Sequence, residues 1–167
     1  MAVTVRGVLT GGLLPGPSPG IALAANVPAY GAVHGSAGVL FLPEQKDPTG
    51  DFAFGLTFAW IGPCFEPLRG SRGALSACAK LDLGAIHSVV YKLDPTAPGD
   101  RFWAAGSLSA EGRLRLVGPL VAEAGLELLV PITQEGFSIQ EGKKTASIYQ
   151  EWAAGLAGFL GLGVSIP

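Results

Sequence analysis

The chain has 167 residues and a net charge of −2; 49% of its residues are hydrophobic and only 14% are charged. Soluble domains usually carry about 25% charged residues, so this chain is short of solubilising side chains, and its charge argues against nucleic acid as a partner. No segment is apolar over the roughly 18 residues that a transmembrane helix needs, and 25 glycines with 13 prolines argue against a helical bundle.

Alternation of side-chain type with a period of two predicts eight strands along the chain. Weaker patterns cover residues 2–11, 20–27 and 32–42, and clearer ones cover residues 51–61, 74–89, 102–116, 120–130 and 151–166. Several of these reach the roughly 9–11 residues with which a tilted strand spans a bilayer. The pattern predicts an all-β fold: one eight-stranded antiparallel up-and-down (meander) transmembrane β-barrel over residues 1–167.

The segment 51–61 shows the alternation most clearly. Its odd positions are small or polar, and its even positions are bulky and apolar: Phe52, Phe54, Leu56, Phe58 and Trp60. In a membrane barrel the apolar face of a strand meets lipid, so we expect the even positions to point outward. Aromatic residues near strand ends predict a girdle at the membrane interface; they are Phe52, Trp60, Phe102, Trp103, Tyr149 and Trp152.

The connections between the predicted strands alternate in length. Residues 28–31 and 117–119 form tight turns, whereas residues 13–19, 43–50, 90–99 and 132–150 form longer loops. Short turns at one rim and long loops at the other are typical of outer-membrane barrels, with both termini on the short-turn, periplasmic side. The connection 62–73 falls on the short-turn side but is long, so it is an exception to this pattern.

Nearly all charged residues in the middle of the predicted strands fall on the polar faces. They are Arg6, Lys80, Asp82, Glu111, Arg113, Arg115, Glu123 and Glu127. A lysine or arginine that faces lipid at mid-membrane costs about 2–4 kcal/mol, so we expect these side chains to point inward. Because side chains fill the interior of an eight-stranded barrel, we expect a polar network that plugs the lumen rather than a conducting or proton-relaying path.

Cys64 and Cys78 are the only cysteines in the chain. In an oxidising compartment they are able to form a disulfide, which would close a loop of about 15 residues and contribute roughly 3 kcal/mol in the chain-entropy model. There is no Cys-x-x-Cys motif, and His34 and His87 lie far away in sequence. We therefore expect neither a metal site nor another cofactor.

Gly62-Pro63-Cys64, followed by a strand that opens with Ser76-Ala77-Cys78-Ala79, resembles the "PC…C" signature of a family of short uncharacterised myxobacterial barrel proteins. The glycine-rich segment 154–164 is similar to the last strand of that family, and the likeness extends over roughly the whole chain. The resemblance implies an eight-stranded outer-membrane barrel like OmpA or OmpX, with a disulfide between Cys64 and Cys78. It implies no known activity.

His34 and Ser36 lie two residues apart on a predicted strand, so both side chains point to the same side. Eight-stranded lipid A deacylases place a histidine and a serine in this way, with an acidic partner, and the histidine activates the serine. Here no acidic partner is evident, so we interpret the pair as polar filling of the lumen. His87 and Ser88 are adjacent and point to opposite faces, and no phosphate-binding loop, GxGxxG or GxSxG motif occurs.

These observations predict a non-enzymatic protein of the bacterial outer membrane with a plugged lumen. Its role would be structural, or adhesive through the loops 43–50, 90–99 and 132–150, with membrane lipid and an unidentified loop partner as its contacts. Two alternatives stay open: a soluble lipocalin-like barrel that binds a small apolar ligand inside, and a lipid-modifying outer-membrane enzyme. Residues 1–6 lack the regions of a secretory signal, so the membrane interpretation requires a signal upstream of Met1.

Overall fold

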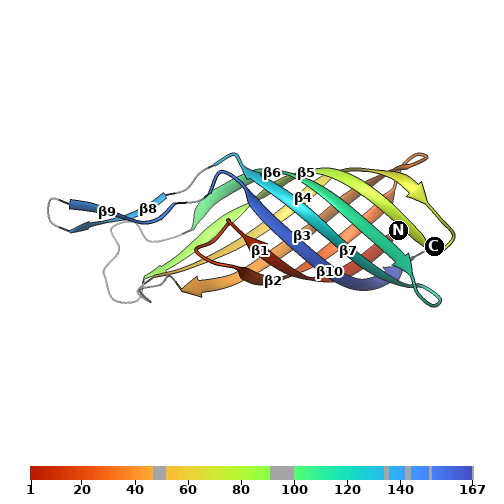
Figure 1. The fold of residues 1–167 in the computed structure, drawn as a ribbon, viewed down its shortest axis with the longest axis horizontal. Helices are drawn as coiled ribbons and strands as arrows, with labels where there is room; N and C mark the ends of the chain where they lie inside the picture. Colours follow the sequence, from red (N-terminus) through yellow and green to blue (C-terminus); the bar gives the residue numbers. More distant parts are fainter. Residues whose placement is uncertain (47–51, 91–99, 134–135, 142–143, 151, 167) are drawn as a thin grey trace.

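Eight of the ten strands that the structure describes close into one antiparallel barrel (Figure 1). The computed structural model describes residues 1–46, 52–90, 100–133, 136–141, 144–150 and 152–166. The barrel strands are β1 (Ala2–Gly11), β2 (Ser18–Pro28), β3 (Val33–Lys46), β4 (Phe52–Arg69), β5 (Gly73–Val90), β6 (Arg101–Arg115), β7 (Leu120–Pro131) and β10 (Gly155–Ser165). β10 pairs with both β7 and β1, which closes the meander. Among the described residues, no helix has the length and apolar character needed to cross a membrane.

The predicted fold of eight antiparallel strands in meander order is confirmed. A hairpin within the segment 132–150 is an addition that the sequence pattern did not reveal. Its strands are β8 (Gly136–Glu141) and β9 (Lys144–Gln150), and they form a separate two-stranded sheet. In Figure 1 this hairpin projects beyond the barrel at the end opposite the two termini. Strands of six and seven residues are too short for alternation to distinguish them from a loop.

β4 and β5 are each 18 residues long, and this removes the exceptional connection predicted over residues 62–73. β4 continues to Arg69, β5 begins at Gly73, and only residues 70–72 join them. The prediction of a long connection is therefore wrong, and this turn is as short as the others at its rim. Pro63 and Pro67 break the strand pattern in the sequence, and Pro67 lies within a register shift of the ladder, where a missing backbone N–H is tolerated.

The two other turns at this rim each place a glycine in the left-handed region. Gly31 has a φ of 60° and Gly118 a φ of 59°, a conformation that other residues adopt only with strain. Backbone hydrogen bonds from Ala29 to Val33 and from Leu116 to Leu120 close the two turns. The predicted tight turns are thus present between β2 and β3 and between β6 and β7.

The bulky face of β4 points into the barrel. Phe54 is 1% exposed and Trp60 7% exposed, whereas Ile61 on the opposite face is 67% exposed. The prediction that the even positions of β4 face lipid is therefore wrong, because alternation defines two faces of a strand without defining which one lies inside. These side chains fill the interior nearer the long loops; this apolar core includes Leu13, Leu14, Leu40, Leu42, Phe52, Phe54, Leu56, Phe58, Trp60, Ile86, Trp103 and Leu129.

Three glycines make room for aromatic residues on the paired strand. A Cβ at Gly38 would collide with the ring of Trp60, and a Cβ at Gly125 would collide with the ring of Phe159. A Cβ at Gly84 would collide with the backbone of β4 at Thr57 and Phe58. The register pairs Gly38 with Trp60, Gly84 with Phe58 and Gly125 with Phe159. Gly38 and Gly125 thus let an inward aromatic ring lie across the neighbouring strand, and Gly84 lets its strand approach β4 closely at Phe58.

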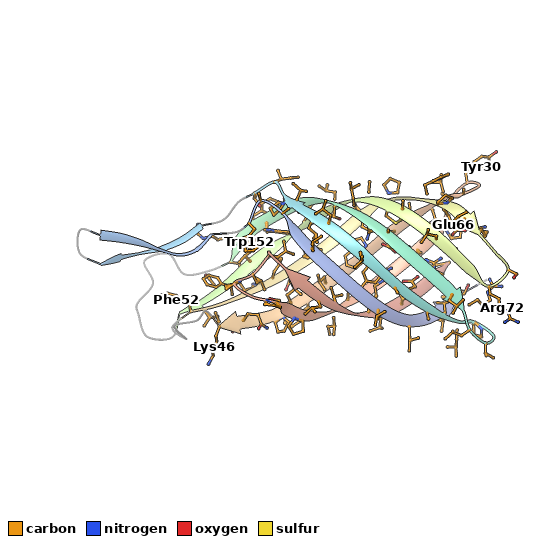
Figure 2. All side chains as sticks on the ribbon, viewed as in Figure 1. Tyr30, Lys46, Phe52, Glu66, Arg72 and Trp152 are labelled. Carbon is orange, nitrogen blue, oxygen red and sulfur yellow. A yellow bond between two sulfur atoms is a disulfide. The ribbon has the colours of Figure 1, made fainter. Side chains whose placement is uncertain are left out.

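The outer surface of the barrel is apolar around its circumference. Large apolar side chains between 41% and 72% exposed stand outward from all eight strands; they include Val5, Leu9, Ile21, Leu23, Val39, Phe41, Ile61, Leu81, Leu83, Leu108, Leu126, Leu128, Leu156, Leu160 and Leu162. Figure 2 shows side chains projecting from the ribbon along the barrel wall between the two rims. Of the predicted aromatic girdle, Phe102 and Trp152 are exposed. Phe52, Trp60 and Trp103 are buried inside instead, and the side chain of Tyr149 lies outside the described part of the chain.

Candidate functional site

A cluster of ionised side chains lies in the interior between the apolar core and the short turns. β1, β5, β6 and β7 contribute Arg6, Lys80, Glu111 and Glu123, and each of these residues is at most 6% exposed. All four occupy inward positions of the alternation. β1 pairs with neither β6 nor β7. The register places Gly161 of β10 between Arg6 and Glu123, so Arg6 reaches the two glutamates over the inner face of β10.

Arg6 holds two carboxylates at once. Its Nη2 donates to Glu123 Oε2 at 2.8 Å and to Glu111 Oε2 at 3.2 Å, and its Nε donates to Glu123 Oε2 at 3.2 Å. Thr4 Oγ1 donates to the same oxygen of Glu123 at 2.9 Å. The Phe159 ring lies 4.4 Å from Arg6 Cζ, a distance at which the aromatic face attracts the cation. Arg6 is therefore the centre of the cluster.

Lys80 provides the second cation of the cluster. Its Nζ donates to Glu111 Oε1 at 2.7 Å and to Glu127 Oε1 at 3.4 Å. Arg113 Nε donates to Glu123 Oε1 at 2.8 Å, nearer the short-turn rim. These contacts join six of the eight residues predicted for the lumen network: Arg6, Lys80, Glu111, Arg113, Glu123 and Glu127.

Two of the predicted network residues are not joined to the cluster. Asp82 is fully buried on β5, and neither of its carboxylate oxygens has a hydrogen-bond partner among the described residues. Arg115 is exposed at the end of β6 and points into the mouth of the barrel instead of the lumen. In the cluster the cations Arg6, Lys80 and Arg113 meet the carboxylates Glu111, Glu123 and Glu127, and Asp82 adds a buried carboxylate outside these pairs.

A disulfide joins Cys64 and Cys78, which face each other in the ladder of β4 and β5. The same rung of the barrel brings His34 on β3 opposite Cys64. The ligand atoms of His34 and the two cysteines lie within 4.8 Å of one another. Their separation along the sequence gave no indication of this proximity. Because the sulfurs are bonded to each other, they are not available as thiolate ligands for a metal.

The histidine–serine pairs do not form catalytic dyads. His34 and Ser36 both point inward, but Ser36 Oγ accepts a hydrogen bond from Trp60 Nε1 at 3.3 Å, and His34 Nε2 has no partner among the described residues. His87 lies on the outer side of β5 near the long loops. It contacts Asp100 Oδ1 at 2.8 Å through Nδ1 and Thr57 Oγ1 at 3.1 Å through Nε2.

A cavity of about 360 Å³ opens at the short-turn end of the barrel. Its wall includes four arginines from the ends of β4 and β6 and the turn after β4: Arg69, Arg72, Arg113 and Arg115. Glu66, His34 and Asn26 line its inner part. Figure 2 shows Glu66 and Arg72 at this end, away from Phe52 and Trp152. The sequence pattern did not predict this site, because its members come from strand ends rather than from one strand face.

No protein-family model matches the sequence, and comparison with curated protein sequences also finds no match. Solved structures do match. Neisserial surface protein A (NspA) has a TM-score of 0.61 with this chain at 11% identity, over 99% of this chain and 95% of that one. The N-terminal β-barrel domain of Pseudomonas aeruginosa OprF has a TM-score of 0.57 at 9% identity, over 98% and 96% of the two chains.

Ail, the attachment invasion locus protein of Yersinia pestis, has a TM-score of 0.58 at 10% identity, over 98% of this chain and 95% of that one; one such structure is a complex with the heparin analogue sucrose octasulfate. Identities this low show a shared fold and no shared activity. The barrel that the resemblance implied is confirmed, whereas membership of the myxobacterial family stays a resemblance. The chain has an all-β fold, a closed eight-stranded antiparallel meander barrel that resembles outer-membrane barrels.

Proposed function

We propose that this protein is a small barrel of the bacterial outer membrane with a closed interior, and that its role is structural or exerted through the long-loop end. The observation that carries the proposal is the outer surface, where large apolar side chains surround the barrel while arginine, lysine and glutamate lie inside. A water-soluble monomer rarely exposes a contiguous apolar patch larger than a few hundred Å². A soluble lipocalin-like barrel would instead carry its charges outside.

The filled interior supports a scaffold rather than a channel. The apolar core occupies the half nearer the long loops, and the ionic cluster occupies the half nearer the short turns. Between them, a cavity lined by residues such as Arg6, Trp60 and Glu127 has a volume of only about 20 Å³. A space of this size holds no more than about one water molecule. We therefore expect no ion conductance and no catalytic activity of the lumen.

The end that carries the long loops is the part best placed to meet a partner outside the membrane. NspA is named a surface protein and Ail an attachment protein, and the projecting hairpin of β8 and β9 gives this chain an extended structure at the corresponding end. In sequence, the segments 44–52, 91–101 and 132–151 at this end hold eight acidic and five basic residues. This charge favours a cationic partner over a polyanion such as the heparin analogue bound by Ail.

Cell fractionation tests the proposal directly. The chain is expressed behind a bacterial secretory signal, and we expect it in the outer-membrane fraction, released only by detergent. Recovery as a monomer soluble without detergent would overturn the membrane assignment. A variant in which a short glycine–serine linker replaces residues 134–151 should still insert, because the strands of the hairpin pair only with each other. Loss of cell adhesion in that variant, with insertion retained, would assign adhesion to the hairpin.

A second candidate function, hydrolysis of a lipid ester, rests on a separate observation. The imidazole of His87 contacts the hydroxyl of Thr57 and the carboxylate of Asp100, which is the connectivity of a nucleophilic triad. These residues lie on the outer side of the barrel near the long loops. In such a reaction Thr57 Oγ1 attacks the ester carbonyl, and His87 takes the hydroxyl proton and passes it to the leaving alcohol. Water then releases the fatty acid from the threonine ester.

Release of fatty acid from phospholipid vesicles that contain the folded protein tests this candidate. Thr57→Val should abolish release, and Thr57→Ser should retain it, since only the hydroxyl takes part in the reaction. Absence of release by the parent protein, or equal release by Thr57→Val, removes hydrolysis and leaves the non-enzymatic proposal standing.

A further inference from the structure

We propose that the cavity at the short-turn end is a binding site for a phosphate-bearing ligand, because arginines surround its mouth and a buried histidine lines its inner wall. The proposal concerns this end of the barrel only. It does not rest on the function proposed for the long-loop end, and it holds whether or not the barrel spans a membrane.

The charge of the cavity wall is strongly positive. Arg69, Arg72, Arg113 and Arg115 line it, and Glu66 is the one acidic side chain of the lining. The whole chain has a net charge of −2, so these four arginines are grouped here against the overall charge. A cavity lined by one sign of charge focuses the field and raises the local concentration of ions of the opposite sign.

Two of these arginines have no side-chain partner in the part of the chain that the structure describes. Arg69 pairs with Glu66 on its own strand, and Arg113 pairs with Glu123 below it. Arg72 and Arg115 lie beside each other, since the backbone N–H of Arg115 donates to the carbonyl oxygen of Arg72 at 2.7 Å. Arg72 and Arg115 thus supply two guanidinium groups without carboxylate partners from neighbouring backbone positions, and these groups are available as donors to an oxyanion.

The inner wall of the cavity supplies an independent observation. His34 is 7% exposed, lines the cavity and has no hydrogen-bond partner for Nε2 among the described residues. A buried ring nitrogen without a partner costs free energy, and a small rotation of the His34 side chain toward a ligand oxygen in the cavity would satisfy it. The rung that holds His34 beside the Cys64–Cys78 disulfide keeps the ring in place.

The number and spread of these donors favour phosphate over carboxylate. A carboxylate has two oxygens and is satisfied by one guanidinium, whereas a phosphate group offers three oxygens and up to two negative charges. A cavity of about 360 Å³ holds a phosphate with part of the group that carries it. Two sources share this chemistry: free phosphate, and the headgroup of a phospholipid at the rim of the barrel.

Calorimetric titration of the full chain in a non-ionic detergent tests the proposal. Inorganic phosphate and dihexanoyl phosphatidic acid are titrated separately at low ionic strength, and each should give saturable binding at one site. The variant Arg72→Gln/Arg115→Gln should bind about tenfold more weakly or worse. His34→Leu, with its fold checked by circular dichroism, should also bind more weakly. As a matched control, Lys46→Gln/Arg101→Gln removes two exposed cations from the opposite end and should leave binding unchanged.

The two titrations also distinguish the sources. At least tenfold tighter binding of the phosphatidic acid identifies a lipid headgroup as the ligand, and equal or tighter binding of inorganic phosphate identifies a free phosphate. Both results support the site. Absence of saturable binding for both probes overturns it, and so does an equal loss of affinity in the two double variants, since that result reflects net charge alone.

Discussion

Arg6 on β1 and Glu123 on β7, separated by 117 residues in the chain, are joined over the inner face of β10 by a hydrogen bond of 2.8 Å. The two strands do not pair, because β10 lies between them. The link therefore fixes the shape of the barrel cross-section in a way that the ladder hydrogen bonds do not. Arg6 also bonds Glu111, so this one guanidinium connects β1, β6 and β7.

Arg6→Met should destabilise the folded barrel by about 3–5 kcal/mol, because it leaves Glu111 and Glu123 buried without their main cation. Methionine keeps much of the volume of the side chain, so the loss reports the charge rather than a cavity. Urea unfolding of the protein in lipid vesicles, followed by tryptophan fluorescence, measures the change. Arg115→Met is the control, since this exposed arginine should change the unfolding free energy by less than about 0.5 kcal/mol. Equal losses in the two variants would contradict a structural role for the cluster.

Asp82→Asn should have the opposite sign and stabilise the barrel by on the order of 1 kcal/mol at neutral pH. Asp82 is fully buried, its oxygens have no hydrogen-bond partner among the described residues, and the interior already holds more carboxylates than cations. Glu111→Gln provides the comparison, because that carboxylate accepts from Arg6, Lys80 and Ser109 and its loss should destabilise. If the two substitutions change the unfolding free energy in the same direction, the contrast between an unpaired Asp82 and a paired Glu111 is refuted.

The barrel could be predicted because the alternation that marks its eight strands is visible in a single sequence. The inward charges could be predicted for the same reason: outward charges on those strands would meet the apolar surface. The prediction of orientation failed on β4, because a bulky apolar face is able to pack inside the barrel as well as to meet lipid. The choice between the two faces of β4 depends on the space that Gly38 leaves for the Trp60 ring and on the close approach of β4 and β5 at Gly84. Both depend on register across strands.

The mouth cavity and the rung of His34, Cys64 and Cys78 could not be predicted from spacing along the chain. Their members come together through the register of three or more strands, and the bulge near Pro67 shifts that register by an amount that the sequence does not show. Two signals pointed to the disulfide: the chain has only two cysteines, and the "PC…C" resemblance implies their pairing. No comparable signal pointed to His34 beside it.

Removal of the disulfide should weaken the barrel by roughly 3 kcal/mol, since the bond closes a short loop in the unfolded chain. The cysteines are 14 residues apart and face each other in the ladder, so Cys64→Ala/Cys78→Ala leaves the pairing of β4 and β5 possible. The expected result is a lower unfolding midpoint in urea for the double variant. A thiol reductant should lower the midpoint of the parent toward that of the variant and leave the variant unchanged. Free thiols in the parent under oxidising conditions would contradict the bond.

Gly84→Ala should destabilise the barrel by about 1–3 kcal/mol or more, because the added methyl group overlaps the backbone of the paired strand at Thr57 and Phe58. Gly106→Ala is the matched control on the next strand. Its Cβ would meet no atom within 4 Å, and its φ is not positive, so the unfolding free energy should stay within about 0.5 kcal/mol of the parent. Thermal unfolding in detergent compares the two variants. Similar midpoints would show that the strands separate enough to accept the methyl group.

Leu126→Arg tests which solvent surrounds the barrel. Leu126 is 70% exposed in the middle of β7, so an arginine there breaks no contact of the interior. If hydrocarbon surrounds this position, the substitution should cost about 2–4 kcal/mol in vesicles, whereas at the rim of the bilayer the cost falls to about 0–1 kcal/mol. Val117→Arg, 78% exposed in the turn between β6 and β7, provides the rim control. If Leu126→Arg costs no more than Val117→Arg, the outer apolar surface of the barrel faces water. The two substitutions should differ in energy only if the solvent differs between the two positions.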